Sequence, residues 1–151
     1  MRELDRIQDQ IVRAHRGEAW HGPSLLELLD GVDEKMAEAR PIGGVHSIRE
    51  LVAHVIAWQE EAARRLRGQG RDLPPAEDWP DAKSWTALVE RLKRAHDGLV
   101  EAAGELEDGA LDERLAGRRE SAYGLLHGIV QHNLYHAGQI AILKKALSTT
   151  V

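Results

Sequence analysis

The spacing of the apolar residues constrains the fold of this chain more than any other feature of its sequence. Over four long stretches, apolar side chains recur every three or four positions, which matches the 3.6 residues per turn of an α-helix. The strict alternation of a half-buried β-strand is scarce. Two capping boxes, in which a serine is followed three positions later by a glutamate, mark helix starts at Ser24 and Ser47. We therefore predict an all-α protein.

The predicted helices are separated by segments that contain glycine or proline. The four long helices span residues 3–17, 48–67, 85–106 and 123–147, and two shorter ones lie at 25–29 and 33–39. The proline-rich stretch 71–83 is predicted to be a long irregular crossover, because such a connection is too long for a simple hairpin. No helix can bury its apolar stripe alone, so we expect a single domain over residues 1–151, a four-helix bundle with long crossover connections.

Composition excludes several classes of function. The chain has no cysteine, which rules out a disulfide scaffold, a thiolate zinc finger, an iron–sulfur site and a cysteine nucleophile. Twenty basic and 25 acidic residues give a net charge of −5, so no nucleic-acid partner is expected. No apolar run has the roughly 20 residues of a membrane span, and the charged N-terminus lacks the apolar core of a signal peptide. We expect a cytoplasmic protein without a membrane partner.

Histidine stands out, with eight residues of this type. Because cysteine is absent, any metal site must use histidine, carboxylates and water. His132 and His136 are four residues apart on a predicted helix, so both imidazoles lie on one face, and both occupy positions of its apolar stripe. Two buried imidazoles need hydrogen-bond partners, whereas a shared metal ion would bind both lone pairs and keep both rings neutral.

An interpretation without a metal has equal weight: His132 and His136 are partly exposed in a groove and form hydrogen bonds with neighbouring residues or water. The residues between them, 133–135, lack the glutamate of the His-Glu-x-x-His motif, which argues against a zincin-type protease. A third ligand must come from another helix, and His54 is the best candidate, with His96 as its competitor. The other histidines are expected on the surface or the flank of a helix (His15, His127) or in loops (His21, His46).

Three segments resemble the DinB/YfiT-like superfamily: 47–58 (SIRELVAHVIAW), 131–140 (QHNLYHAGQI) and 19–24 (AWHGPS). The resemblance covers essentially the whole chain and implies a four-helix bundle, often a homodimer, with a metal site that falls on His54, His132 and His136. Members of the superfamily bind nickel, zinc and other divalent ions, and they include thiol-dependent S-transferases and a thiol-dependent isomerase. The family label does not imply DNA binding.

Three imidazoles leave an open position on the ion, as in catalytic sites. A low-molecular-weight thiol could bind there as a thiolate and attack a small electrophilic substrate, and its sulfur must come from outside because the chain has no cysteine. In a metal-dependent hydrolase, water would attack instead, with Glu50 or Glu61 as a nearby base. The competing interpretation of both glutamates is a solvated helix face.

We therefore predict a divalent-metal-binding protein, with nickel or zinc as the ion, that is a thiol-dependent S-transferase or a metal-dependent hydrolase. The alternative is a non-catalytic binding or stress-response module in which the metal is structural, and a third possibility is a bundle without metal. Three glycines of the last helix and the resemblance favour a homodimer. Among the tryptophans, Trp58 and Trp85 are expected in the core, and Trp20 and Trp79 at a pocket mouth.

Overall fold

The computed structural model describes residues 1–82 and 84–148, and the regular elements in this part of the chain are helices. The all-α prediction is therefore confirmed. In chain order the helices are α1 (Glu3–Arg16), α2 (Leu25–Leu29), α3 (Glu34–Glu38), α4 (Ile48–Leu66), α5 (Pro75–Asp78), α6 (Trp85–Gly104), the 3₁₀-helix η1 (Asp108–Ala110) and α7 (Ala122–Ser148).

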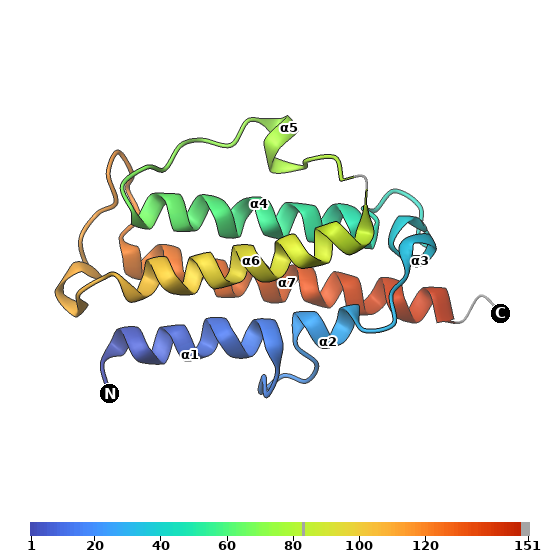
Figure 1. Ribbon diagram of the computed structural model, residues 1–151, viewed down its shortest axis with the longest axis horizontal. Coiled ribbons are helices and arrows are strands. Elements are labelled where there is room, and N and C mark those ends of the chain that lie inside the picture. The colour runs from blue at the N-terminus through green and yellow to red at the C-terminus, as the bar shows by residue number, and fades with distance from the viewer. Residues whose placement is uncertain (83, 149–151) are drawn as a thin grey trace.

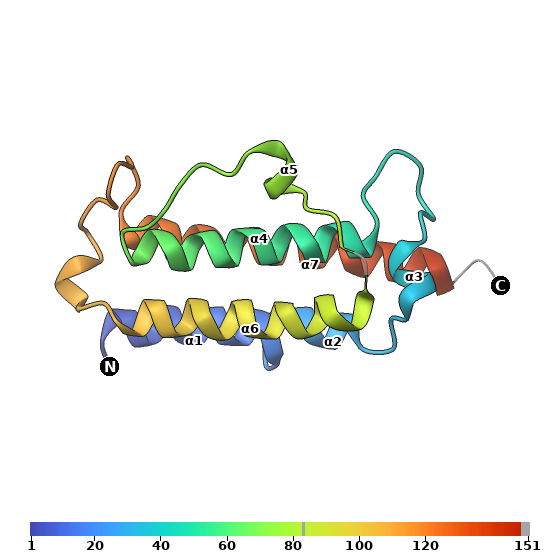
Figure 2. The ribbon, with the colours of Figure 1, turned by 45° about the horizontal axis from the view of Figure 1, so that its top comes forward.

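The four long helices α1, α4, α6 and α7 lie side by side, and α2 follows α1 along the same direction (Figures 1 and 2). Helices α4 and α6 run in the same direction, and α1 and α7 run in the opposite one. Helix α4 packs against α6 and α7, and α1 packs against the same two helices. Because α4 and α6 are parallel, the chain between them must return along the whole length of α4.

This return segment differs from the sequence prediction in one respect. It contains the short helix α5, where an irregular crossover was predicted, and α5 lies over the outer side of α4 (Figure 2). Pro75 occupies the first position of α5, which suits proline because its φ is already helical and no N–H is needed there. Lys83, the last residue of the predicted crossover, lies outside the described residues. The placement of α5 brings Asp78 and Trp79 against the middle of α4.

The local signals in the sequence fix most of the helix starts. Both predicted capping boxes are present, and the Ser47 hydroxyl accepts a hydrogen bond from the Glu50 backbone N–H. Ser84 likewise caps α6 through the backbone N–H of Ala87. These bonds satisfy N–H groups that have no partner within the helix.

Buried polar side chains divide the apolar core into two clusters. Along α4, for example, Ile56 belongs to one cluster and Ala62 to the other, with Gln59 fully buried between them. Each of the other long helices has a buried polar residue at the same division. We call this set the polar layer: His15 of α1, Gln59 of α4, His96 of α6 and Asn133 of α7.

His15 corrects a prediction, because it was expected on the surface but is only 2% exposed. Its ring stacks on that of His96, with centroids 3.8 Å apart and planes 5° from parallel. The physical reason lies in α1 itself: His15 follows Ile7 and Ile11 at steps of four residues, so it continues the buried stripe. No helix in the described part of the chain is both long and apolar enough to cross a membrane.

Candidate metal centre

Helices α4 and α7 bring His54, His132 and His136 together. Each of the three offers one ring nitrogen, and these nitrogens lie within 4.8 Å of one another. The Nε2 atoms of His54 and His132, which are 78 residues apart in the sequence, are separated by 3.0 Å. His54 and His136 are buried and His132 is half-buried. The antiparallel packing of α4 against α7 thus brings His54 next to His132 and His136.

The donor set fits one divalent cation. Two imidazole nitrogens bound tetrahedrally to one zinc ion, at about 2.0–2.1 Å each, lie about 3.3 Å apart. The observed 3.0 Å between His54 and His132 is close to this value. Neutral imidazole is also a preferred ligand of zinc, nickel, copper and iron. The spacing of this pair and the chemistry of all three side chains therefore suit such an ion.

The ring of His54 is held by the crossover segment. Its Nδ1 atom donates a hydrogen bond to the backbone oxygen of Asp78 at 2.7 Å, and the Oδ1 atom of the same residue is 3.2 Å away. Trp58 donates from Nε1 to this Oδ1 atom at 2.7 Å. Because a carbonyl oxygen can only accept, the proton of His54 is fixed on Nδ1. The Nε2 lone pair is thereby directed at His132, an arrangement common among metal-binding histidines.

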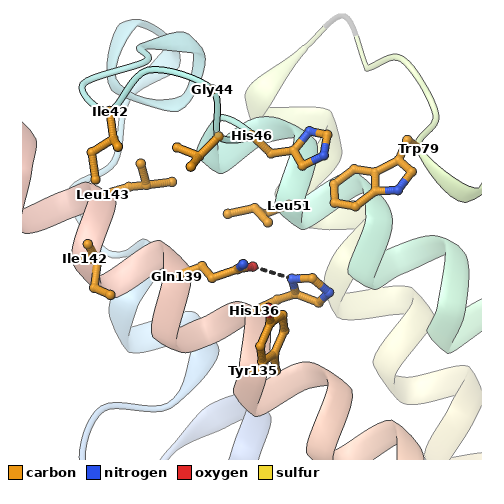
Figure 3. Close-up of a pocket in the computed structure, with 11 residues that line it drawn as sticks. Ile42, Gly44, His46, Leu51, Trp79, Tyr135, His136, Gln139, Ile142 and Leu143 are labelled. Carbon is orange, nitrogen blue, oxygen red and sulfur yellow. Dashed lines mark hydrogen bonds between the residues drawn. The ribbon is translucent and has the colours of Figure 1, made fainter.

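His136 is oriented in the same way by its own helix. Its Nδ1 atom is 2.6 Å from Oε1 of Gln139, which lies one turn further along α7 (Figure 3). With Nδ1 donating to this amide oxygen, Nε2 is the ring nitrogen left for a ligand role. The sequence placed Gln139 beside the histidines but did not indicate this bond.

Burial keeps the imidazoles of His132 and His136 uncharged near neutral pH. Burial is the main reason that the pKa of His132 is lowered to about 4, and the neighbouring His136 and His54 rings contribute to this shift. Burial also lowers the pKa of His136, although the hydrogen bond with Gln139 opposes this effect. A metal ion binds the neutral ring, so the site does not need to lose a proton from either side chain at pH 7.

Other predicted site residues lie elsewhere. His96, the competitor for the third ligand position, belongs to the polar layer and stacks on His15. Glu61 is fully buried, where it pairs with Arg64 and Arg65 and accepts from the Arg71 backbone N–H. The interpretation of Glu61 as a residue of a solvated face is therefore wrong, and its role as a base stays a prediction.

Glu50 is engaged in the cap of α4, where its polar partners are Arg40, His46 and Ser47. Its carboxylate accepts from the Ser47 backbone N–H at 2.8 Å, pairs with Arg40, and lies 3.3 Å from Nδ1 of His46. The prediction that His46 lies in the loop before a helix cap is confirmed. His21 is an exposed loop residue, and His127 is half-buried on α7 against Tyr123.

The positions of the four tryptophans agree only in part with the prediction. Trp85 is buried as expected, and Trp79 lies beside the three histidines, stacked on His54 with ring centroids 4.0 Å apart. Trp58 is half-buried against the core. Trp20 is fully exposed and lines none of the described cavities, so its placement at a pocket mouth is wrong. Asp78 was missed, because no sequence signal links the end of α5 with the middle of α4.

Comparisons with known proteins agree with this geometry. The DinB superfamily matches residues 19–140, a range that includes all three histidines. YrdA, an uncharacterised protein of Bacillus subtilis (strain 168), is 30% identical over 102 residues. That match covers 64% of this chain and 61% of YrdA, less than two thirds of the relative's length. No solved structure matches the chain. Since the superfamily match covers most of the sequence, the chain belongs to the DinB superfamily.

Proposed function

We propose that this chain binds one divalent metal ion through Nε2 of His54, His132 and His136. The main support is that three ring nitrogens from two helices lie within 4.8 Å of one another. In addition, the Nδ1 atoms of His54 and His136 are hydrogen-bonded to oxygen acceptors of Asp78 and Gln139. Nickel and zinc are the ions that we propose, and both suit imidazole ligands. We further propose a single domain over residues 1–151 with the four-helix bundle and crossover connections expected for the superfamily.

The proposed activity is transfer of an external thiol to a small electrophilic substrate. Three protein ligands leave an open position, where a bound ion would lower the pKa of an added thiol. The sulfur would form a bond to an electrophilic carbon, and the group displaced from that carbon would leave with the bonding electrons. In this scheme His54 and His136 are held in position by Asp78 and Gln139.

Hydrolysis is the less favoured chemistry, for a structural reason. It needs a base to take a proton from water, and Glu50 and Glu61 are both committed to other partners. Asp78 lies against the His54 ring, but its carboxylate already accepts from Trp58. These contacts support a thiol, which loses its proton more easily than water, as the proposed nucleophile.

A structural role for the ion is the second candidate. The histidines connect α4 with α7, and Asp78 connects the same centre with the crossover segment. An ion at this point would therefore brace three segments of the fold. Removal of such an ion would lower the melting temperature strongly, whereas an open catalytic centre would lose mainly activity.

The test is elemental analysis of the protein purified without a His-tag or a chelating column. We expect about one divalent ion per chain in the wild type and its loss in His54→Ala and His132→Ala. His127→Ala, on α7 but outside the three histidines, is the matched control and should keep the ion. A wild type that stays free of metal after addition of nickel, zinc or manganese would contradict the proposal. Turnover of an electrophile with and without an added thiol then tests the reaction.

A further inference from the structure

A cavity of about 400 Å³ opens beside His136, one of the three histidines (Figure 3). Its wall combines the loop that contains residues 42–46, Trp79 after α5, and the outer side of α7 from residue 135 to residue 143. His136 lies in this wall, so the cavity reaches one of the proposed metal ligands. The volume falls within the range of small-molecule sites, which is roughly 300–1,000 Å³.

The charge of the lining residues limits which ligands this cavity can bind. Among the described lining residues there is no aspartate, glutamate, lysine or arginine, and the side chains that can form hydrogen bonds are His46, Trp79, Tyr135, His136 and Gln139. Two of these, His136 and Gln139, already bond to each other. A charged group of a ligand would lose water here without gaining a counter-charge, which is costly. The cavity therefore selects for a neutral ligand.

Exposed apolar residues cluster around this cavity. Seven large hydrophobic residues are exposed in the described part of the chain, and four of them line this cavity. These four, with exposed fractions from 37% to 67%, are Ile42, Val45, Tyr135 and Ile142. Single exposed apolar side chains are ordinary, whereas a cluster around a concavity marks a binding site. The ligand is therefore expected to be mainly apolar.

One wall of the cavity is rigid before any ligand arrives. The Trp79 ring is stacked between His46, with centroids 3.7 Å apart, and His54, with centroids 4.0 Å apart. His46 is held in turn by Glu50, which is anchored to the Ser47 backbone N–H. Ordering these rings therefore adds little to the cost of binding, which favours a small ligand of few contacts.

We infer that this cavity binds a neutral, mainly apolar small molecule, one end of which lies at His136. That this molecule is the electrophilic substrate rests on the proposed function, whereas its binding does not require the metal. The volume of the cavity and the presence of His136 in its wall favour a small molecule over a second copy of the chain, which would cover the rim without filling the interior.

Two fluorescent probes that differ by one charge test this inference. N-phenyl-1-naphthylamine is neutral and apolar, and 8-anilinonaphthalene-1-sulfonate adds a sulfonate to the same two ring systems. We expect saturable binding of the neutral probe at one site per chain and at least about tenfold weaker binding of the anion. Displacement of the neutral probe then ranks neutral electrophiles as ligands.

A pair of variants on α7 locates the probe. Ile142→Glu places a carboxylate in the wall of the cavity and should weaken binding of the neutral probe about tenfold. Tyr123→Glu makes the same kind of change at an exposed residue of α7 outside the cavity and should leave binding unchanged. Both positions are exposed, so neither variant is expected to disturb folding.

The titrations are run on metal-free wild type and on His132→Ala. Probe binding that persists in these two proteins supports the inference that the cavity is a ligand site. If the wild type also takes up no metal, only the metal proposal is overturned. Metal uptake without saturable probe binding overturns this inference and leaves the metal proposal intact. Equal affinity for the two probes, or unchanged binding in Ile142→Glu, also overturns it. One further result would overturn the inference: the wild type sediments as a dimer, Ile142→Glu dissociates this dimer, and no probe binds. A second copy of the chain would then occupy this face.

Discussion

The Nδ1 atom of His54 lies 2.7 Å from the backbone oxygen of Asp78, 24 residues further along the chain. This hydrogen bond joins the middle of α4 to the end of α5 and sets the direction of the His54 lone pair. The Asp78 carboxylate supports the same ring and is held in turn by Trp58. The return segment between α4 and α6 thus takes part in building the candidate metal centre.

Removal of the Asp78 carboxylate should weaken metal binding. Partners that orient metal-binding histidines commonly contribute about tenfold to hundredfold in affinity, so Asp78→Ala is expected to raise the zinc dissociation constant by about that factor. A competition titration against a coloured chelator measures it. Asp81→Ala removes an exposed carboxylate of the same segment and should have no effect. Equal zinc affinity in Asp78→Ala and wild type would show that Asp78 does not support the site.

The stacked histidines of the polar layer should make stability depend on pH. Burial lowers the pKa of His15 to about 3 and that of His96 to about 4, from 6.5 in the unfolded chain. Between about pH 4 and 6.5 the unfolded state binds more protons, so the free energy of unfolding rises with pH. The contribution of the two neutral histidines to the free energy of unfolding is complete above about pH 6.5. It is lost as the pH falls through their pKa values in the folded protein.

The variant His96→Leu removes one of these titrating groups. We expect urea unfolding at a series of pH values to show a shallower slope between pH 4 and 6.5, smaller by up to about 1.4 kcal/mol per pH unit. His21→Leu changes an exposed loop histidine and should keep the wild-type slope. An unchanged slope in His96→Leu would mean that His96 has the same pKa in the folded and the unfolded protein.

Glu61 and Arg65 form a buried ion pair, with Nε of Arg65 3.0 Å from Oε1 of Glu61. Glu61→Ala leaves a buried guanidinium with a weaker set of partners and should lower the free energy of unfolding by about 3–5 kcal/mol. The neighbouring Glu60 pairs with Arg91 in a more exposed position, so Glu60→Ala should cost about 1 kcal/mol or less. Urea denaturation compares the two variants, and equal losses would contradict the difference in burial.

Gln59 is fully buried, and neither its amide nitrogen nor its amide oxygen has a hydrogen-bond partner among the described residues. Gln59→Leu removes this desolvated amide at nearly constant volume and should raise the free energy of unfolding by about 1 kcal/mol. Gln8→Leu is the contrasting variant, because Gln8 donates to the Val100 backbone oxygen at 3.0 Å and would lose that bond. A loss of stability in Gln59→Leu would show that the amide has a role in the core.

The sequence alone determined the features that depend on neighbouring residues. Hydrophobic spacing located all four long helices, and two capping boxes marked where α2 and α4 begin. The spacing of His132 and His136 placed both imidazoles one turn apart on α7, because side chains four residues apart share a helix face. The same rule, applied to Ile11 and His15, would have placed His15 in the core.

Only the tertiary structure decided which distant side chains meet. The 3.0 Å between His54 and His132 depends on how α4 packs against α7, and the bond of His54 with Asp78 depends on the path of the return segment. The stack of His15 on His96 and the burial of Glu61 likewise depend on packing between segments far apart in the chain. Local propensities fix the helices, but these contacts come from burying four apolar stripes together, and no short stretch of sequence contains that information.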